Sequence, residues 1–202
     1  MCGFFSIYSP NKINTGIVNK ARDASKSMFS RGPDDAFEYV DNNYASFFYR
    51  LAIRDLTNKS RQPFISKSKR HVISYNGEIY YFNDNHSKQD LYNSDTIQLA
   101  NFIDQYGEDS FNKIRGMFAI CFYDIKNKKV TITRDCIGIK PLFFSNLIIN
   151  GSKLFIFSST QKAIIDFMKF PLDDNQIFRY LKMGISCDKR NTFFKGIHRL
   201  IP

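Results

Sequence analysis

The chain has 202 residues, of which 43% are apolar and 24% are charged, and its formal net charge is +10. This balance is typical of a folded globular protein with one large core, and it excludes a disordered or collagen-like chain. The basic residues are scattered, with small clusters only at 67–70 and 126–129 between strand-like segments, so we expect no nucleic-acid partner.

No apolar run reaches the length needed to cross a bilayer, and the first residues lack the basic and apolar regions of a signal peptide. The four cysteines are too irregularly spaced for a disulfide framework or a zinc site; they are Cys2, Cys121, Cys136 and Cys187. We therefore expect a cytoplasmic protein with no membrane partner and no metal.

The first half of the chain predicts several strands and one helix. Residues 3–8 are apolar and β-prone, and residues 14–29 have helical spacing that ends at the breaker segment 30–35. Residues 44–49 with 52–53 predict a strand pair or one bent strand. Residues 71–75 predict a strand that runs into a tight turn at Asn76-Gly77.

The second half predicts a helix over 96–106, with Ser94 or Asp95 as its N-cap and Gly107 after its end. The remaining segments read as strands at 118–124, 129–134, 142–144, 148–149 and 154–158 and as helices at 162–168 and 175–181. Short, closely spaced strands with grouped helices favour an antiparallel α+β fold forming a single domain over residues 1–202. A parallel βαβ fold is the alternative.

Cys2 directly follows the initiator methionine. If Met1 is removed, this one residue carries both a thiol and a free α-amino group, whose ordinary pKa of about 7.7 suits a base near neutrality. An N-terminal amine that activates its own nucleophile is an established catalytic arrangement. The alternative is a cysteine without a role. No histidine has the context of a papain-like cysteine–histidine pair.

Several polar clusters would complete such a site. A cysteine that attacks an amide needs donors for the oxyanion, and the Asn76 side chain with the Gly77 N–H can supply them. Arg50 offers a planar two-pronged donor for an α-carboxylate, while Glu78 and Asp95 offer carboxylates for an α-ammonium group. Each cluster alone could be a turn, a strand end or a helix cap. Together they predict a site that binds glutamine and attacks its side-chain amide.

Ordered motifs continue this pattern along nearly the whole chain. They are Cys2-Gly3, Arg31-Gly32-Pro33-Asp34-Asp35, Arg50-Leu51-Ala52-Ile53-Arg54-Asp55-Leu56, Gln62-Pro63, Asn76-Gly77-Glu78-Ile79-Tyr80, Ser94-Asp95-Thr96, Gly116-Met117-Phe118-Ala119 and Arg134-Asp135-Cys136-Ile137-Gly138-Ile139-Lys140-Pro141-Leu142. In this order they resemble the glutaminase domain of glutamine-hydrolysing asparagine synthetases, which are class II amidotransferases of the N-terminal-nucleophile hydrolase group.

The resemblance implies a four-layer αββα sandwich, in which two stacked antiparallel sheets are flanked by helices. It also implies a role for each matching residue. Cys2 would be the nucleophile, with its own α-amino group as general base, and Asn76 and Gly77 would form the oxyanion hole.

The resemblance assigns the remaining site residues to glutamine binding. Arg50 would hold the α-carboxylate, and Glu78 and Asp95 would receive the α-amino group. The segment containing Leu51, Ile53 and Arg54 would line the pocket. Arg31 would support the loop around Cys2, and residues 134–142 would be a structural loop facing a synthetase domain.

Three departures from the family pattern stand out. Ser30 replaces the usual histidine before Arg31, and Tyr49 precedes Arg50 where many synthetases carry a charged residue. The Ser-Gly-Gly-x-Asp-Ser type of ATP-binding loop does not occur in this sequence. The domain itself therefore needs no cofactor, and ATP and Mg²⁺ are expected only in a synthetase domain or subunit outside this chain.

Glutamine is the expected small-molecule substrate, with ammonia passed to aspartate by the synthetase partner. The sequence also leaves open that the chain forms a homodimer. Two alternatives also stay open: an amidotransferase serving another acceptor, such as a sugar acid in polysaccharide synthesis, and a non-catalytic module that binds glutamine.

Overall fold

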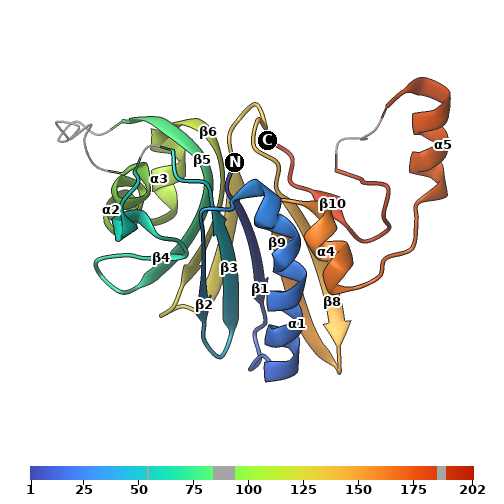
Figure 1. Ribbon diagram of the computed structural model, residues 1–202, viewed down its shortest axis with the longest axis horizontal. Helices are drawn as coiled ribbons and strands as arrows, with labels where there is room; N and C mark the ends of the chain where they lie inside the picture. The colour runs from blue at the N-terminus through green and yellow to red at the C-terminus, as the bar shows by residue number, and fades with distance from the viewer. Residues whose placement is uncertain (54, 84–93, 186–189) are drawn as a thin grey trace.

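The computed structural model describes residues 1–53, 55–83, 94–185 and 190–202. Arg54, one of the expected pocket residues, lies outside this described part. Two antiparallel sheets are stacked face to face, and helices cover their outer faces (Figure 1). The predicted α+β architecture, an αββα sandwich, is confirmed.

The larger sheet has six strands in the order β10-β8-β9-β1-β3-β2. These strands are β1 (Gly3–Tyr8), β2 (Asp35–Val40), β3 (Tyr44–Arg50), β8 (Phe143–Ile149), β9 (Ser152–Ser158) and β10 (His198–Arg199). Its outer face carries α1 (Thr15–Ser25), the 3-10 helix η1 (Lys26–Arg31) and α4 (Gln161–Phe167). Asn14 caps α1 by accepting the Gly16 N–H at 2.7 Å.

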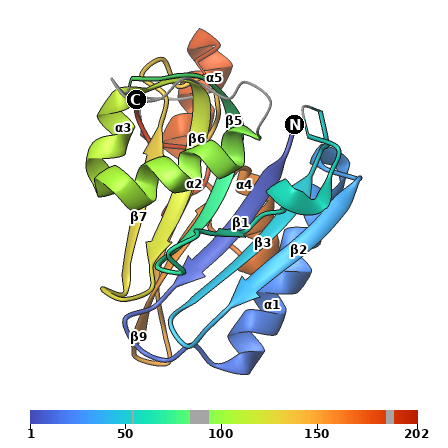
Figure 2. The same ribbon diagram turned by 90° about the vertical axis from the view of Figure 1, so that its left-hand side faces the viewer.

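The smaller sheet has four strands in the order β4-β5-β6-β7. They are β4 (Phe64–Ile65), β5 (His71–Phe82), β6 (Ile114–Asp124) and β7 (Lys129–Arg134). Figure 2 shows its outer face covered by α2 (Asp95–Tyr106) and α3 (Ser110–Lys113), with the short η3 (Gly107–Asp109) between them. A further 3-10 turn, η2 (Asn58–Ser60), follows β3.

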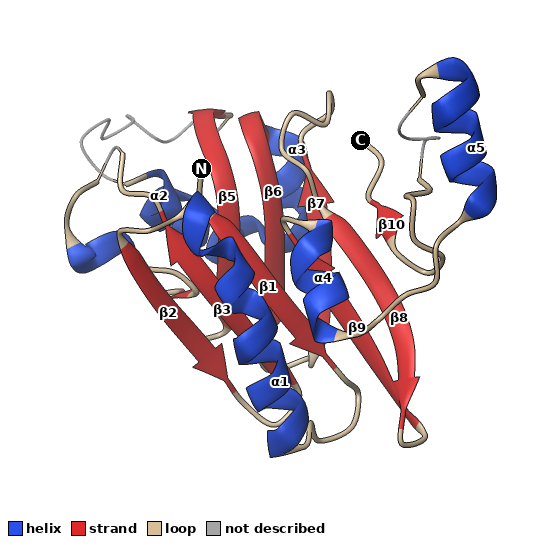
Figure 3. Cartoon of the chain, turned by 45° about the vertical axis from the view of Figure 1, so that its right-hand side comes forward, coloured by secondary structure: helices blue, strands red, loops and turns tan. Residues whose placement is uncertain are grey.

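The last helix, α5 (Asp174–Met183), projects away from the sandwich, whereas α1 and α4 lie side by side on the larger sheet (Figure 3). Gln176 is the only buried residue of α5. Among the described residues, no helix is long and apolar enough to span a bilayer.

Three apolar clusters fill the spaces between the four layers. The cluster between the sheets includes Phe4, Tyr44 and Phe48 from the larger sheet and Cys121 and Tyr123 from the smaller one. β1 is buried on both faces, because α1 covers one side and the smaller sheet the other, and its sequence is accordingly a nearly continuous apolar run.

The predicted turn at Asn76-Gly77 is wrong. β5 continues unbroken from His71 to Phe82 and pairs with β6 along its length, with Asn76 opposite Ala119 and Gly77 opposite Phe118. Burial of Tyr75, Ile79 and Phe82 beneath α2 stabilises the extended strand over the local preference for a turn. Gly77 is required by close packing instead, since a Cβ there would lie 2.1 Å from the Met117 carbonyl oxygen.

Other boundaries also differ from the expectation. Asp35, the last residue of the expected helix breaker, begins edge strand β2, which has alternating burial and was not predicted. Residues 52–53 are loop rather than strand, and residues 143–144 and 148–149 of the two short expected strands belong to the single strand β8. β2 pairs with β3 and β8 pairs with β9, in each case the next strand along the chain, and this pairing extends both strands beyond what residue preference alone predicts.

Candidate functional site

A cavity of about 130 Å³ opens at the end of the sandwich where β1 begins. Its wall is built from segments far apart in sequence: the start of β1, the loop after β3, the middle of β5 and the N-terminus of α2. The space exceeds what a few water molecules need and suits a small amino acid. The expected site residues that line it are Cys2, Arg50, Leu51, Ile53, Asn76, Gly77, Glu78 and Asp95.

The Cys2 thiol is half-buried and sits against the loop that follows β3. Its Sγ lies 3.5 Å from the Leu51 carbonyl oxygen, to which it donates, and 3.3 Å from the Leu51 nitrogen, from which it accepts. Burial raises the pKa of the Cys2 thiol, although the Leu51 N–H, the chain's α-ammonium group and Arg50 act in the opposite direction. The thiol is therefore protonated at rest and needs a base before it can act as a nucleophile.

Arg31 does not line the cavity, but it contacts Cys2, which does. Its Nε donates to the Cys2 carbonyl oxygen at 3.2 Å. Gly32 beside it passes so close to β3 that a Cβ would lie 2.3 Å from the Tyr49 oxygen. This tight packing places η1 against both β1 and β3, so Arg31 fixes the backbone of Cys2.

Asn76 is almost fully buried, with 2% of its surface exposed, and its Nδ2 has no hydrogen-bond partner among the described residues. An unsatisfied buried amide costs roughly 1–3 kcal/mol, so such groups are uncommon without a reason. Because Asn76 lines the cavity, an oxygen of a bound molecule is a ready partner for this amide.

The Gly77 N–H faces the open edge of the same sheet. The N–H groups of a strand point alternately to its two sides. The Tyr75 N–H points away from β6, since it donates to the Gln62 side-chain oxygen at 2.6 Å. Gly77, two residues further on, directs its N–H to that same side. Its partner Phe118 bonds to Asp135 instead, through both its N–H and its carbonyl.

The Arg50 guanidinium is fixed in the cavity wall by the loop that follows β3. Its Nη1 donates to the Thr57 carbonyl oxygen at 2.8 Å, and its Nη2 donates to Ser60 Oγ at 3.0 Å and to the Asp55 carbonyl oxygen. These contacts use three of the five N–H donors of a guanidinium and orient the group.

Two carboxylates contribute negative charge to the same cavity, Glu78 from β5 and Asp95 from the first turn of α2. Tyr75 Oη donates to Asp95 Oδ2 at 2.9 Å, which orients that carboxylate. Ser94, and not Asp95, is the N-cap of α2 and accepts the Thr96 N–H at 3.2 Å. With Asp55, which also lines the cavity, these carboxylates share one wall with the cations Arg50 and Lys140, and a wall that carries both signs of charge is suited to a zwitterion.

The sequence reasoning missed several cavity residues. Gln62 was part of a recognised motif without a role, yet its amide bridges Tyr75 and Thr96, accepting from the first and donating to the second at 3.2 Å. Lys140 was expected in a purely structural loop, and the structure places it in the cavity wall. Only pairing across the sheets brings these residues to the site. The described residues contain no cluster of three or more His, Cys, Asp or Glu that could hold a metal ion.

Comparison with known proteins identifies the fold's relatives. A family model described as a glutamine amidotransferase domain matches residues 1–202. Asparagine synthetase [glutamine-hydrolyzing] 2 of Bacillus subtilis is 37% identical over 123 residues, which cover 58% of this chain and 16% of that protein.

Two further relatives align over more of the chain. Asparagine synthetase B [glutamine-hydrolyzing] of Escherichia coli is 31% identical over 71% of this chain and 26% of its own length. Asparagine synthetase [glutamine-hydrolyzing] 3 of Bacillus subtilis is 30% identical over 87% of this chain and 30% of its own length. The chain thus spans less than a third of each of these relatives, and it belongs to the glutamine amidotransferase domains of class II related to glutamine-hydrolysing asparagine synthetases.

Proposed function

We propose that this domain hydrolyses glutamine and releases ammonia for a synthetase that amidates aspartate. The observation that carries the proposal is the partnerless buried amide of Asn76 in the same cavity as the Cys2 thiol. A group that accepts a hydrogen bond from Asn76 while its carbon meets Cys2 has the geometry of an amide under attack.

The reaction begins after Met1 is removed. The α-amino group of Cys2 takes the thiol proton, and the thiolate attacks the side-chain amide carbon of glutamine. The oxyanion accepts hydrogen bonds from Asn76 Nδ2 and the Gly77 N–H, each worth about 2.7–4 kcal/mol at comparable sites. The proton passes to the leaving nitrogen, ammonia departs, and a γ-glutamyl thioester remains. Water then attacks the thioester, which releases glutamate and restores the thiol.

Substrate binding uses the charges of the cavity wall. Arg50 pairs with the α-carboxylate of glutamine through its remaining donors, and Glu78 and Asp95 receive the α-ammonium group. Leu51 and Ile53 line the side of the pocket, as Arg54 is also expected to do. Asp95 is held for this task by Tyr75.

The destination of the ammonia is proposed from the relatives alone. Each of the three is named an asparagine synthetase, and each is more than three times as long as the segment that matches. Aspartate activated by ATP and Mg²⁺ on a synthetase domain or subunit is therefore the favoured acceptor. No residue of this chain favours a sugar acid or a purely glutamine-binding role.

The direct test combines intact-protein mass with a glutaminase assay on the same sample. We expect the mass to lack Met1 and glutamate release to disappear in Cys2→Ala. The matched control is Cys136→Ala, which removes an exposed thiol outside the cavity and should leave the rate unchanged. A fully active protein that retains Met1 would rule out the N-terminal base.

The carboxylate clamp has its own test. Arg50→Lys retains the charge and loses the two-pronged fork, so the KM for glutamine should rise at least tenfold with a smaller change in kcat. Arg50→Ala should show a larger increase in KM. An unchanged KM in both variants refutes the role of Arg50.

A further inference from the structure

A buried lysine at the cavity lacks the partner that such a residue normally has. Lys140 is 7% exposed and lines the same cavity as Cys2. Its Nζ donates to the Met1 Sδ at 3.4 Å, and among the described residues no carboxylate pairs with it. A thioether is only a weak acceptor, and lysine is seldom buried without an anionic partner.

The loop before Lys140 is built to hold it there. The carboxylate of Asp135, 2% exposed, accepts the N–H groups of Ile139 at 2.8 Å and Lys140 at 3.1 Å. Burial alone would raise the pKa of Asp135, but these backbone N–H groups outweigh it and hold the pKa below its ordinary value. The charged carboxylate thus pins the backbone of Lys140 against β6.

Gly138 completes the same turn. Its φ is +75°, and a Cβ there would lie 2.8 Å from Arg134 Nη2, so only glycine fits without displacement. Arg134 Nη2 donates to the Gly138 carbonyl oxygen, which closes the turn. Lys140 therefore enters the cavity from a fixed loop rather than as a free surface side chain.

The contact with Met1 brings the Lys140 side chain to the start of the chain. Met1 is bonded directly to Cys2, so the residue that Lys140 contacts is the one whose removal makes Cys2 the N-terminus. Removal of Met1 takes away its thioether partner. The new N-terminus is then the α-amino group of Cys2, in the cavity that Lys140 also lines, and an amino group can accept a hydrogen bond from an ammonium group only in its neutral form.

We propose that Lys140 is a positioning residue that keeps the α-amino group of Cys2 unprotonated at neutral pH. The inference rests on the proposed function, since it concerns the base that activates Cys2. Two ammonium groups in one partly buried cavity repel each other, so the amine with the lower intrinsic pKa loses its proton more readily. A neutral amine is the form that can take the thiol proton.

The other charged groups near this amine act in both directions. Arg31 and Arg50 add positive charge of their own: Arg31 Nε donates to the Cys2 carbonyl oxygen while its Nη2 has no partner among the described residues, and Arg50 donates to the loop after β3. The carboxylates at the cavity are Asp55, Glu78 and Asp95, and they favour the protonated amine. Lys140 differs from these arginines because its hydrogen-bond partner, the Met1 sulfur, is lost when Met1 is removed.

The test compares Lys140→Met, Lys140→Gln and Lys140→Arg with the parent protein after Met1 removal is verified by mass. Lys153→Met is the matched control, because it removes an exposed lysine of β9 outside the cavity. Two quantities are measured against pH: kcat/KM for glutamate release, and the rate of acetylation of the Cys2 α-amino group. Thermal unfolding of each variant verifies that it is folded.

In Lys140→Met and Lys140→Gln, we expect the acid limb of kcat/KM and the midpoint of α-amine acetylation to move up together by about one pH unit. Lys140→Arg and Lys153→Met should match the parent. The inference is overturned if folded Lys140→Met titrates like the parent, or if Lys140→Arg shifts as far as Lys140→Met. If the parent releases no glutamate, but the midpoint of α-amine acetylation is still higher in Lys140→Met than in the parent, the proposed function is refuted and this inference is supported.

Discussion

At the scale of single residues, the site departs from what stability alone would favour. Asn76 keeps a buried amide nitrogen without a partner, and Lys140 keeps a buried ammonium against a thioether. Both are groups that a fold would normally satisfy or replace. Both line one cavity, and under the proposed function a bound substrate supplies the partner that the Asn76 amide lacks.

Asn76→Ala tests this view through a contrast between stability and rate. Removing an oxyanion donor should lower kcat by about 10²–10³-fold with little change in KM. The free energy of unfolding should change little for a buried residue, because the amide nitrogen that is lost has no partner to leave behind. Steady-state kinetics and urea unfolding of one preparation give both numbers. A large loss of stability with normal kcat would mean that the amide is structural.

Residue types in the sequence predicted the contents of the site well but not its geometry. The cysteine, arginine, asparagine and carboxylates expected from their chemistry all line the cavity where the structure describes them. The expected turn at Asn76-Gly77 was wrong because the donors come from the open edge of a continuous strand. That edge exists only once β5 has paired with β6, which is information about distant contacts.

At the scale of elements, the β5–β6 pair carries Asn76 and Gly77, the proposed oxyanion donors, and its two strands approach closely at two glycines. Two glycines face each other diagonally: a Cβ on Gly77 would lie 2.1 Å from the Met117 oxygen, and one on Gly116 would lie 2.2 Å from the Glu78 oxygen. The close approach sets the height of Asn76 and Gly77 relative to the cavity floor.

Gly116→Ala tests the need for this approach. The added methyl group cannot be accommodated without moving backbone, so the free energy of unfolding should fall by about 1–3 kcal/mol. Since the displaced strand carries Asn76, kcat should fall as well. Gly151→Asn is the control, because it sits in open space with φ +76°, a conformation that asparagine tolerates. Unfolding in urea should distinguish the two, and equal stabilities would refute the steric argument.

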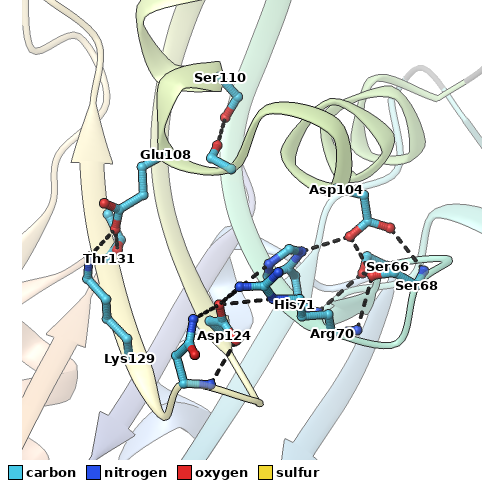
Figure 4. Close-up of polar contacts among 12 residues, drawn as sticks. Ser66, Ser68, Arg70, His71, Asp104, Glu108, Ser110, Asp124, Lys129 and Thr131 are labelled. Atoms are coloured by element: carbon cyan, nitrogen blue, oxygen red, sulfur yellow. Dashed lines mark hydrogen bonds and ion pairs between the residues drawn. The ribbon is translucent and has the colours of Figure 1, made fainter.

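A polar cluster fastens the other end of β5 to its neighbours (Figure 4). Buried His71, the first residue of β5, pairs through Nδ1 with Asp104 of α2 at 2.7 Å. Asp104 also accepts a hydrogen bond from Ser68 Oγ at 2.7 Å. Asp124, at the end of β6, accepts a hydrogen bond from Arg70 Nη2 at 2.7 Å. The cluster ties helix α2, whose N-terminus carries Asp95, to the strand that carries Asn76.

This cluster makes stability depend on pH in the acid range. Burial alone would raise the pKa of Asp104 and of Asp124, but hydrogen bonds, from Ser68 to the first and from Arg70 to the second, hold both below the ordinary value of 3.8. A lowered folded pKa stabilises the fold above the unfolded value, and this stability is lost as pH falls through the folded value. We expect the free energy of unfolding to decline from about pH 5 downward.

Asp104→Asn identifies the source of that decline. At pH 7 it should lower the free energy of unfolding by about 1–3 kcal/mol, because charged hydrogen bonds to Ser68 and His71 are weakened. Below pH 4 its stability should approach that of the parent. Urea unfolding from pH 7 to pH 3 measures both effects. A constant difference between the two proteins across that range would show that Asp104 does not contribute through its charge.

At the scale of the whole molecule, the site lies where both sheets and the N-terminus of α2 meet, so it forms only when the sandwich is assembled. The general architecture could be predicted because strand-like segments and grouped helices are local features. The order β10-β8-β9-β1-β3-β2 could not, since it joins segments from opposite ends of the chain. That order places β1, and with it Cys2, at the centre of the larger sheet.

The net charge of +10 also belongs to this scale. Several basic residues are already engaged with acidic neighbours, as in the pairs Arg22–Glu38 and Lys129–Glu108. We therefore expect only weak nucleic-acid binding that disappears at physiological salt. A gel shift with a random duplex at 50 mM and 150 mM salt tests this. Binding that persists at 150 mM would reopen the nucleic-acid interpretation.

The final prediction concerns how much of the chemistry this chain can perform. Under the proposed function its cavity holds glutamine, but its sequence has no loop of the Ser-Gly-Gly-x-Asp-Ser type, which is the loop expected to bind ATP in a synthetase domain. Supplied with glutamine, aspartate, ATP and Mg²⁺, the chain should release glutamate and ammonia at equal rates and form no asparagine. Asparagine should still not form when ammonia is added directly, because activation of aspartate is the step that this chain is expected to lack. Chromatographic detection of asparagine above the level of a Cys2→Ala control would refute this division of labour and would place the acceptor site within these 202 residues.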